Sequence, residues 1–201
     1  MRFPAKSLQA AGGYLYSHIH ENTLTGLKRN MFWSVFMEFK PIRYAGCKFE
    51  CAILCDWIPW NARDWRELDG TSLEVEFRKG GSVKMGPKTV EASFYMTAHD
   101  PARRVALRLQ LDDQAKFMAT MKMIVDFHGF AGGDSDPNLP IAGKTKISYL
   151  GLIIVKENLR PKVTTESKAL AVAEKFIDLS TYRAPTDEGW RWVFRPRAFR
   201  K

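Results

Sequence analysis

Alternation of apolar and polar residues marks much of the chain as β-strand. Two stretches with a period of two lie between residues 31 and 57. Two further pairs lie at residues 73–85 and 90–111, and Gly80 and Gly81 supply the turn of the first pair. Six strands in this order predict an antiparallel meander with one face buried and one face in water.

Two other stretches have the spacing of helices. Over residues 113–128, apolar side chains recur at helical intervals until Gly129 can end the helix. Residues 121–127 also alternate like a strand, and the period alone does not decide between the two. Residues 166–179 carry an apolar stripe opposite a charged face, which is typical of a surface helix. The candidate N-caps are Asp112 or Asp113 for the first helix and Thr164 or Thr165 for the second.

The region between the two predicted helices contains a loop and a strand. Residues 129–144 are dense in Gly, Pro and Asp, so we expect a long loop that is exposed and mobile. Residues 147–155 are apolar on both faces and rich in β-branched side chains. They predict a central strand that other structure covers on each side.

These elements together predict an α+β fold. We expect a mainly antiparallel sheet of about six to eight strands, either barrel-like or sandwich-like, with two packed helices and basic terminal arms. The predicted organisation is an N-terminal arm over residues 1–30, a single α+β domain over 31–189, and a basic, aromatic C-terminal segment over 190–201.

Composition supports one folded domain. The chain has 201 residues, of which 45% are hydrophobic and 26% are charged, as in ordinary globular proteins. No apolar run approaches the length of a membrane span, so we expect no membrane partner. Three cysteines without an export signal suit a reducing compartment, and the cytoplasm is the expected location.

The three cysteines do not predict a metal site. Cys47, Cys51 and Cys55 alternate with polar residues in a predicted strand. Residues four apart in a strand lie about 13 Å from each other, whereas zinc needs thiolates about 2.3 Å from one ion. We therefore expect all three thiols on the buried side of one strand, as small hydrophobic groups.

Other candidate ligands and catalytic groups are incomplete. His18 and His20 form an H-x-H tripeptide, but their spacing from the other two histidines matches no known metal or catalytic pattern. A calcium loop starting at Asp134 would fail, because it needs Gly and Glu where Leu139 and Thr145 stand. Nucleotide-binding and nucleophile-elbow motifs are missing as well. The sequence thus predicts no metal, no cofactor and no set of catalytic residues.

The charge is concentrated at the two ends of the chain. The net charge is +9; residues 1–48 hold seven Lys/Arg and two Asp/Glu, residues 190–201 hold five and none, and residues 49–189 are nearly balanced. If residues 190–194 form a strand, Trp190, Trp192 and Phe194 share one face. They either pack in the core or stack on bases. The candidate binding residues are Trp190, Arg191, Trp192, Phe194, Arg195, Arg197, Arg200 and Lys201.

This distribution predicts a non-enzymatic binding protein. Basic ends on a nearly neutral body suit nucleic acid, or an assembly that contains it, because cations engage phosphates. A protein-interaction module, either an inhibitor or an assembly subunit that docks on an acidic protein surface, is the main alternative. A third class is a small ligand-binding barrel or a hydrolase, with residues 129–143 as a lid.

Overall fold

The computed structural model describes residues 2–77, 82–85, 88–129 and 134–197, and this part of the chain is mostly β-strand. It has one α-helix, α1 (Glu166–Ala173), where the sequence predicted two. The antiparallel sheet is confirmed, but it has more strands than expected. The described strands are β1 (Ala10–Asn22), β2 (Leu27–Phe39), β3 (Ile42–Tyr44), β4 (Cys47–Phe49), β5 (Ala52–Ile58), β6 (Ser72–Glu76), β7 (Ser82–Met85), β8 (Lys88–Tyr95), β9 (His99–Leu111), β10 (Phe117–Phe127), β11 (Asp136–Val155), β12 (Thr186–Asp187) and β13 (Arg191–Phe194). Of these, β3 and β4 form a separate two-stranded sheet.

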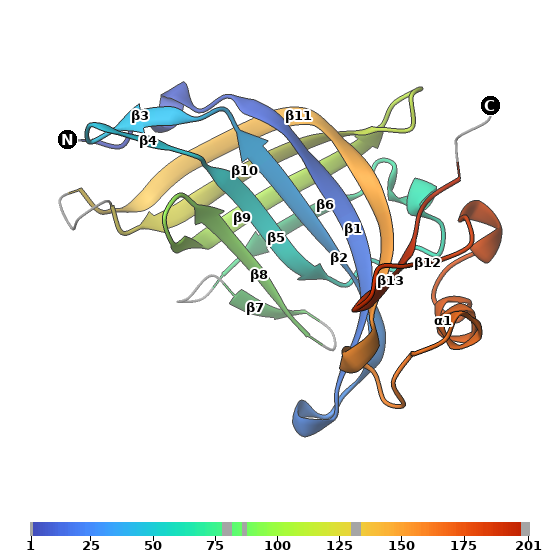
Figure 1. Cartoon of the computed structure of the whole chain (residues 1–201). Helices are drawn as coiled ribbons and strands as arrows, with labels where there is room; N and C mark the ends of the chain where they lie inside the picture. Colours follow the sequence, from blue (N-terminus) through green and yellow to red (C-terminus); the bar gives the residue numbers. More distant parts are fainter. Residues whose placement is uncertain (1, 78–81, 86–87, 130–133, 198–201) are drawn as a thin grey trace.

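Seven of these strands close into a barrel (Figure 1). The order is β1-β2-β5-β8-β9-β10-β11, and β11 pairs back onto β1. The closing pair is parallel, with Tyr14 opposite Ser148 and Ile19 opposite Ile154. The other neighbouring strands of the barrel are antiparallel. Because the barrel has an odd number of strands, strand direction cannot alternate all the way round, and one pair must run in the same direction. β6 pairs with β9 beside this ring, and β7 pairs with β8.

Side chains pack the interior of the barrel, and aromatic rings close both of its ends. At one end Phe3 packs on Tyr44 and Phe127, with ring centroids 5.3 and 4.7 Å away. At the other end Trp65 stacks on Tyr149 at 5.7 Å. All five of these rings are buried. Such packing makes the interior a hydrophobic core and leaves the outer surface to contact ligands.

The segment predicted as a first helix is strand β10. Its odd-numbered residues from Phe117 to Phe127 are all buried, while the even-numbered ones are at least partly exposed. β9 and β11 flank it and take up its backbone hydrogen bonds. Asp112 caps no helix; its carboxylate accepts hydrogen bonds from the backbone N–H groups of Gln114 and Lys116 in the turn before β10. The strand pattern within residues 121–127 was the correct one.

The predicted loop over residues 129–144 is also partly strand. Residues 130–133 lie outside the described residues, but β11 begins at Asp136 and pairs with β10 up to Ile147. Pro137 and Pro140 fit there because the described pairing with β1 starts only at Ser148, so their other side is an open edge. A proline on an edge leaves no ladder hydrogen bond unmade. The prediction of a long mobile loop was therefore wrong for this part.

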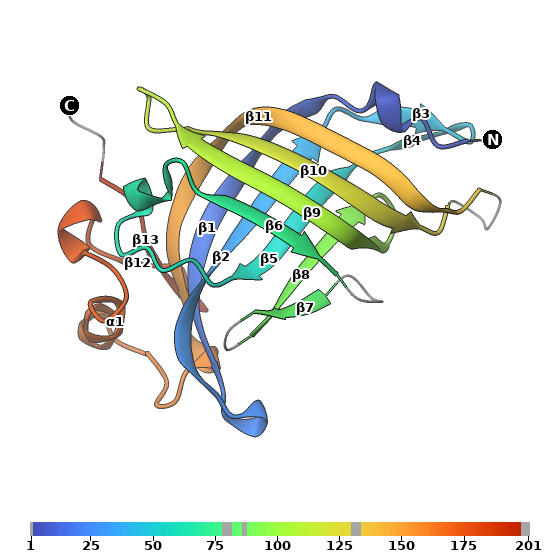
Figure 2. The ribbon, with the colours of Figure 1, turned by 180° about the vertical axis from the view of Figure 1, so that it is seen from behind.

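The ends of the chain pack onto the barrel. Part of the expected N-terminal arm forms β1, whose Leu15 and Ile19 are buried inside the ring. At the other end, β13 pairs with β11, and α1 lies outside the ring (Figure 2). The predicted cap is confirmed, because the Thr165 hydroxyl accepts a hydrogen bond from the N–H of Lys168. The helix it begins has eight residues, and none of the described helices is long and apolar enough to span a membrane.

Candidate functional site

Two aromatic residues of the predicted C-terminal site belong to the core. Trp192 is 6% exposed and donates a hydrogen bond from Nε1 to the carbonyl of Val163, at 2.9 Å. Phe194 is fully buried, and Trp190 is 59% exposed. The three rings therefore do not form one stacking face. Strand pairing of β13 with β11 explains the burial, because it holds this segment against the barrel.

The described cations of the same segment already pair with carboxylates or with backbone carbonyl groups. Arg191 and Arg195 both form ion pairs with Glu188, each at 2.8 Å. Arg197 donates from Nε to the carbonyl of Tyr182. Arg200 and Lys201 lie outside the described residues. The structure thus brings Arg191 and Arg195 together around one carboxylate, which reduces the positive charge they can offer a partner.

The predicted row of three buried cysteines is correct only in part. Cys51 and Cys55 are buried, whereas Cys47 is exposed on β4. β4 belongs to a separate hairpin with β3, so residues 47–57 do not form one strand. Burial raises the pKa of the Cys51 thiol to about 11. Among the described residues, no three His, Cys, Asp or Glu side chains gather as a metal site would require.

The structure does not bring the histidines together. His18 and His20 lie on β1, where both rings pack edge-on against Trp57. His128 Nδ1 lies 2.8 Å from the carboxylate of Asp100. His99 Nδ1 lies 3.0 Å from the Ser93 hydroxyl. These are separate pairs on the protein, with no common centre.

The calcium-like stretch forms local hydrogen bonds instead. The Asp136 carboxylate accepts a hydrogen bond from the backbone N–H of Asn138, as aspartate does in Asx turns. Asp134 hydrogen-bonds the Tyr44 hydroxyl. Of the three side chains at the start of the calcium-like stretch, Asp134, Asp136 and Asn138, the two carboxylates thus already have hydrogen-bond partners in the protein.

A cationic surface lies on the outer side of β9, β10 and β11; β9 and β10 face the viewer in Figure 2, and β11 runs beside β10. It is produced by strand alternation, since buried residues on each strand alternate with exposed ones. We call it the cationic face. Its exposed cations are Arg103, Arg104, Arg108, Lys122, Lys144 and Lys146.

The register of the three strands brings these cations close together. Arg108 and Lys144 both lie opposite Thr120, one on each side of it. Lys122 follows two residues after Thr120 on the same side of β10, between Ala106 and Ala142. With strands about 4.8 Å apart, the Cα atoms of Arg108 and Lys144 are roughly 10 Å apart, and Lys122 is roughly 8 Å from each. The Cα atoms of the three residues form a triangle, with Thr120 midway between Arg108 and Lys144.

Three of the six cations have no acidic partner among the described residues. Arg103 pairs with Asp126 at 3.0 Å. Arg104 pairs with Glu74, and Lys146 pairs with Asp112 at 2.7 Å. The hydrogen bond from Lys146 is the main reason why the pKa of Asp112 falls to about 2. By contrast, no carboxylate among the described residues forms an ion pair with the other three. These are Arg108, Lys122 and Lys144, here called the cation triangle.

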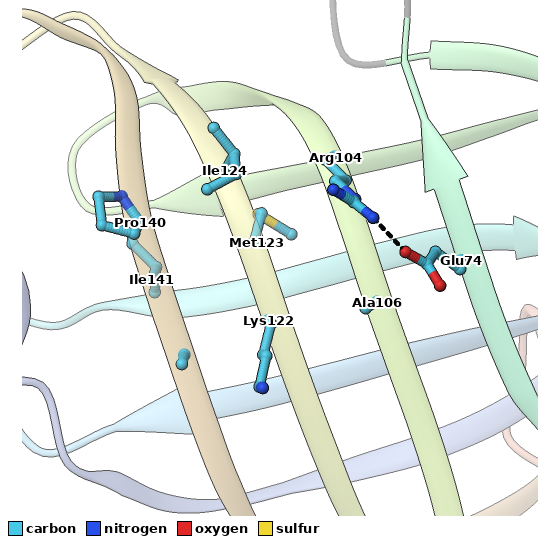
Figure 3. A pocket seen from close by; sticks show the side chains of 9 residues that line it. Glu74, Arg104, Ala106, Lys122, Met123, Ile124, Pro140 and Ile141 are labelled. Carbon is cyan, nitrogen blue, oxygen red and sulfur yellow. Dashed lines mark hydrogen bonds and ion pairs between the residues drawn. The ribbon is translucent and has the colours of Figure 1, made fainter.

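A shallow hollow adjoins the cation triangle (Figure 3). Its volume is about 460 Å³, and the small side chains Ala106 and Ala142 leave space on either side of Lys122. Ile124 and Pro140 add an apolar wall, and the ion pair of Arg104 with Glu74 forms the opposite side. The hollow therefore places the ammonium group of Lys122, which forms no ion pair with a described carboxylate, beside an apolar surface. That combination fits a ligand with an anionic group and a flat apolar part.

The sequence offered little sign of this site. The cation triangle comes from three strands that are well separated along the chain, and its residues lie in the nearly charge-balanced region. Only the pairing of β9 with β10 and of β10 with β11 makes them neighbours. Alternation within residues 105–111 indicates that Arg108 faces outward, but the segment that carries Lys122 fits both a helical and a strand period.

Comparisons with known proteins give the chain no relatives from which a function could be transferred. No protein-family model, curated protein or solved structure matches this chain.

Proposed function

We propose that this protein is a non-enzymatic binding protein that engages nucleic acid through the cationic face of its barrel. The observation that carries the proposal is the cation triangle, three cations whose Cα atoms lie within about 10 Å of one another and that form no ion pair with a described carboxylate. Cations gain affinity for nucleic acid by displacing the counterions of phosphates, and a cation already paired with a carboxylate has less to gain.

The hollow favours single-stranded nucleic acid over a duplex. Single strands leave the faces of their bases open, and proteins bind them by pairing phosphate contacts with surfaces on which bases pack. Lys122 supplies the charge, and Ile124 and Pro140 supply an apolar surface beside it. Duplex bases are stacked on one another and cannot enter such a hollow without unpairing.

The basic C-terminal segment is proposed as a secondary contact only. Arg191 and Arg195 share Glu188, so binding of phosphate to either would compete with an existing ion pair. Arg197, Arg200 and Lys201 follow the last residue of β13 and carry three further charges. They can add to the affinity without defining where the ligand lies.

Salt dependence of binding tests the proposal. Fluorescence anisotropy with a labelled single-stranded oligonucleotide should give a log affinity that falls linearly with log salt concentration. Each phosphate contact contributes a slope of about −0.7 for a single strand, so replacing the cation triangle by alanine should flatten the slope by about 2 units. A matched variant replaces Lys28, Lys48 and Lys175, three exposed lysines elsewhere on the surface, and removes the same charge.

The matched variant distinguishes a defined binding site from general attraction of nucleic acid to the positive net charge. Equal loss of affinity in both triple variants would show that only net charge matters and would overturn the proposal. Retention of nucleic-acid binding by the cation-triangle variant, together with its loss on replacing Arg197, Arg200 and Lys201, would move the site to the C-terminal segment. Absence of binding to any nucleic acid would favour the alternative of an acidic protein partner.

A further inference from the structure

The barrel carries an aromatic and acidic surface away from the cationic face. It lies on the outer side of β1, β2 and β5, which face the viewer in Figure 1, whereas β9 and β10 face the viewer in Figure 2. Outward-pointing residues of β1 alternate with buried Leu15, Ser17 and Ile19. We call it the aromatic face. It includes Tyr14, Tyr16, Phe36, Glu38 and Asp56.

The rings of this face lie against one another. Tyr14 is directly opposite Phe36 in the β1–β2 register, and their rings stack at 4.9 Å with an interplanar angle of 23°. Tyr16 continues the row, with its ring centroid 6.2 Å from that of Tyr14. All three side chains are partly exposed. Stacked, partly exposed rings offer the negative face of their π-systems to a ligand.

Two carboxylates add negative charge to the same surface. Glu38 follows Phe36 by two residues on the outward side of β2 and is exposed. Asp56 lies on β5, and its charge is, after burial, the largest cause of the raised pKa of Tyr16. Both charges act at Tyr14: burial is the largest cause of its raised pKa, and Glu38 and Asp56 are the next. The aromatic face therefore has an electrostatic preference for a cation.

Another part of the protein shows which cation suits such a surface. The guanidinium of Arg191 lies 4.6 Å from the ring centroid of Trp190, and the same guanidinium pairs with Glu188 at 2.8 Å. A ring, a guanidinium and a carboxylate thus form one unit on the surface. Tyr14, Phe36 and Glu38 repeat the ring and the carboxylate, but no described Lys or Arg forms an ion pair with Glu38.

We propose that the aromatic face is a second binding site, which takes an arginine side chain from an extended segment of a partner protein. The guanidinium would lie over the Tyr14 ring and donate hydrogen bonds to Glu38. Arginine suits this surface better than lysine, because its planar group stacks on rings and donates to a carboxylate at the same time. The site is independent of the cationic face and of the nucleic acid proposed to bind there.

Anisotropy of a fluorescein-labelled peptide with two arginines separated by Gly and Ser tests this site. The wild-type protein should bind it saturably at concentrations below about 1 mM, and a peptide with lysines in place of the arginines about fivefold more weakly. Glu38→Gln and Tyr14→Leu should each weaken arginine-peptide binding by about fivefold. Tyr14→Phe keeps the ring and should stay within about twofold of the wild type.

Controls separate the site from charge and from folding. Glu174→Gln removes one exposed carboxylate from the end of α1 and should leave peptide binding unchanged. If Tyr14→Leu fails to fold, Glu38→Gln decides on its own. The cation-triangle variant should bind the peptide as the wild type does, so this proposal and the nucleic-acid proposal can fail separately.

Four results would overturn the proposal. The first is that the arginine peptide does not bind saturably, and the second is that Glu38→Gln and Glu174→Gln weaken its binding equally. The third is that a neutral oligosaccharide such as cellohexaose binds more tightly than the peptide. The fourth is that the protein self-associates and the peptide reverses this association. The third would assign the rings to a sugar. The fourth, measured by sedimentation velocity, would assign the aromatic face to a second copy of the chain.

Discussion

The hydroxyl groups of Tyr149 and Tyr182 lie 2.9 Å apart in the interior of the protein. Tyr149 belongs to β11 of the barrel, whereas Tyr182 belongs to the segment between α1 and β12. The Tyr149 hydroxyl also lies 2.8 Å from the hydroxyl of Ser17 on β1. This chain of three hydroxyl groups joins the first strand, the last barrel strand and the C-terminal segment.

Removing one hydroxyl from this chain should destabilise the fold. Tyr182→Phe leaves the Tyr149 hydroxyl with one hydrogen-bond partner fewer in a buried site, and we expect a loss of about 1–2 kcal/mol in the free energy of unfolding. Urea unfolding followed by circular dichroism measures it. Tyr95→Phe, at a ring that is 40% exposed, is the control and should change the stability by less than about 0.5 kcal/mol. Equal effects of the two substitutions would contradict this account.

The same tyrosines should make the protein sensitive to alkaline pH. Burial raises the pKa of both hydroxyls above its ordinary value, while the unfolded chain ionises its tyrosines near pH 10. The unfolded state then binds fewer protons, so the stability present below about pH 10 declines as the pH rises further, by up to about 1.4 kcal/mol per pH unit for each tyrosine. Urea midpoints between pH 8 and 11 should show this decline, with a shallower slope in Tyr182→Phe.

The three thiols should react at two very different rates. Cys47 is exposed, and Cys51 and Cys55 are buried. Burial also raises the pKa of both buried thiols, which lowers the fraction of reactive thiolate. Labelling of native protein with Ellman's reagent should give one rapid equivalent, which Cys47→Ser abolishes, and two more only in denaturant. Three rapid equivalents in the native state would contradict the burial of Cys51 and Cys55.

Two tryptophans of the C-terminal segment should differ in their effect on stability. Trp192→Ala leaves a cavity and an unpaired Val163 carbonyl, so we expect a loss of about 3–5 kcal/mol. Trp190→Ala removes an exposed ring and its contact with Arg191, which should cost less than about 1 kcal/mol. Urea unfolding of the two variants makes the comparison. Similar losses would show that β13 is not anchored as described.

Local patterns predicted the parts of the fold that depend on neighbouring residues. Alternation identified the antiparallel strands, and a threonine before an amphipathic stretch identified the start of α1. The same reasoning failed at β10, where Phe117 and Met121 satisfy both the helical and the strand period. The partners of β10 in the sheet decided the outcome, and they are not visible in its own sequence.

Long-range pairing accounts for what the sequence did not show. Pro137 and Pro140 normally indicate a loop, and they are accommodated because this half of β11 has an open edge. The cation triangle depends on the register of β10 with both of its neighbours. The charge at the C-terminus was visible in the sequence, whereas its neutralisation by Glu188 required the fold.

The parallel seam between β1 and β11 has a consequence for how the protein is made. β1 leaves the ribosome first, but its partner across the seam is synthesised only after β2, β5, β8, β9 and β10. Until then the β1–β2 hairpin has one unsatisfied edge, which can pair with another nascent chain. A barrel whose closing pair joins strands far apart in the sequence folds slowly, on the order of milliseconds to seconds, because that contact forms last. We expect chaperones that bind exposed strand edges during synthesis to raise the yield of folded protein. Chaperones that act only after the chain has left the ribosome should raise it less.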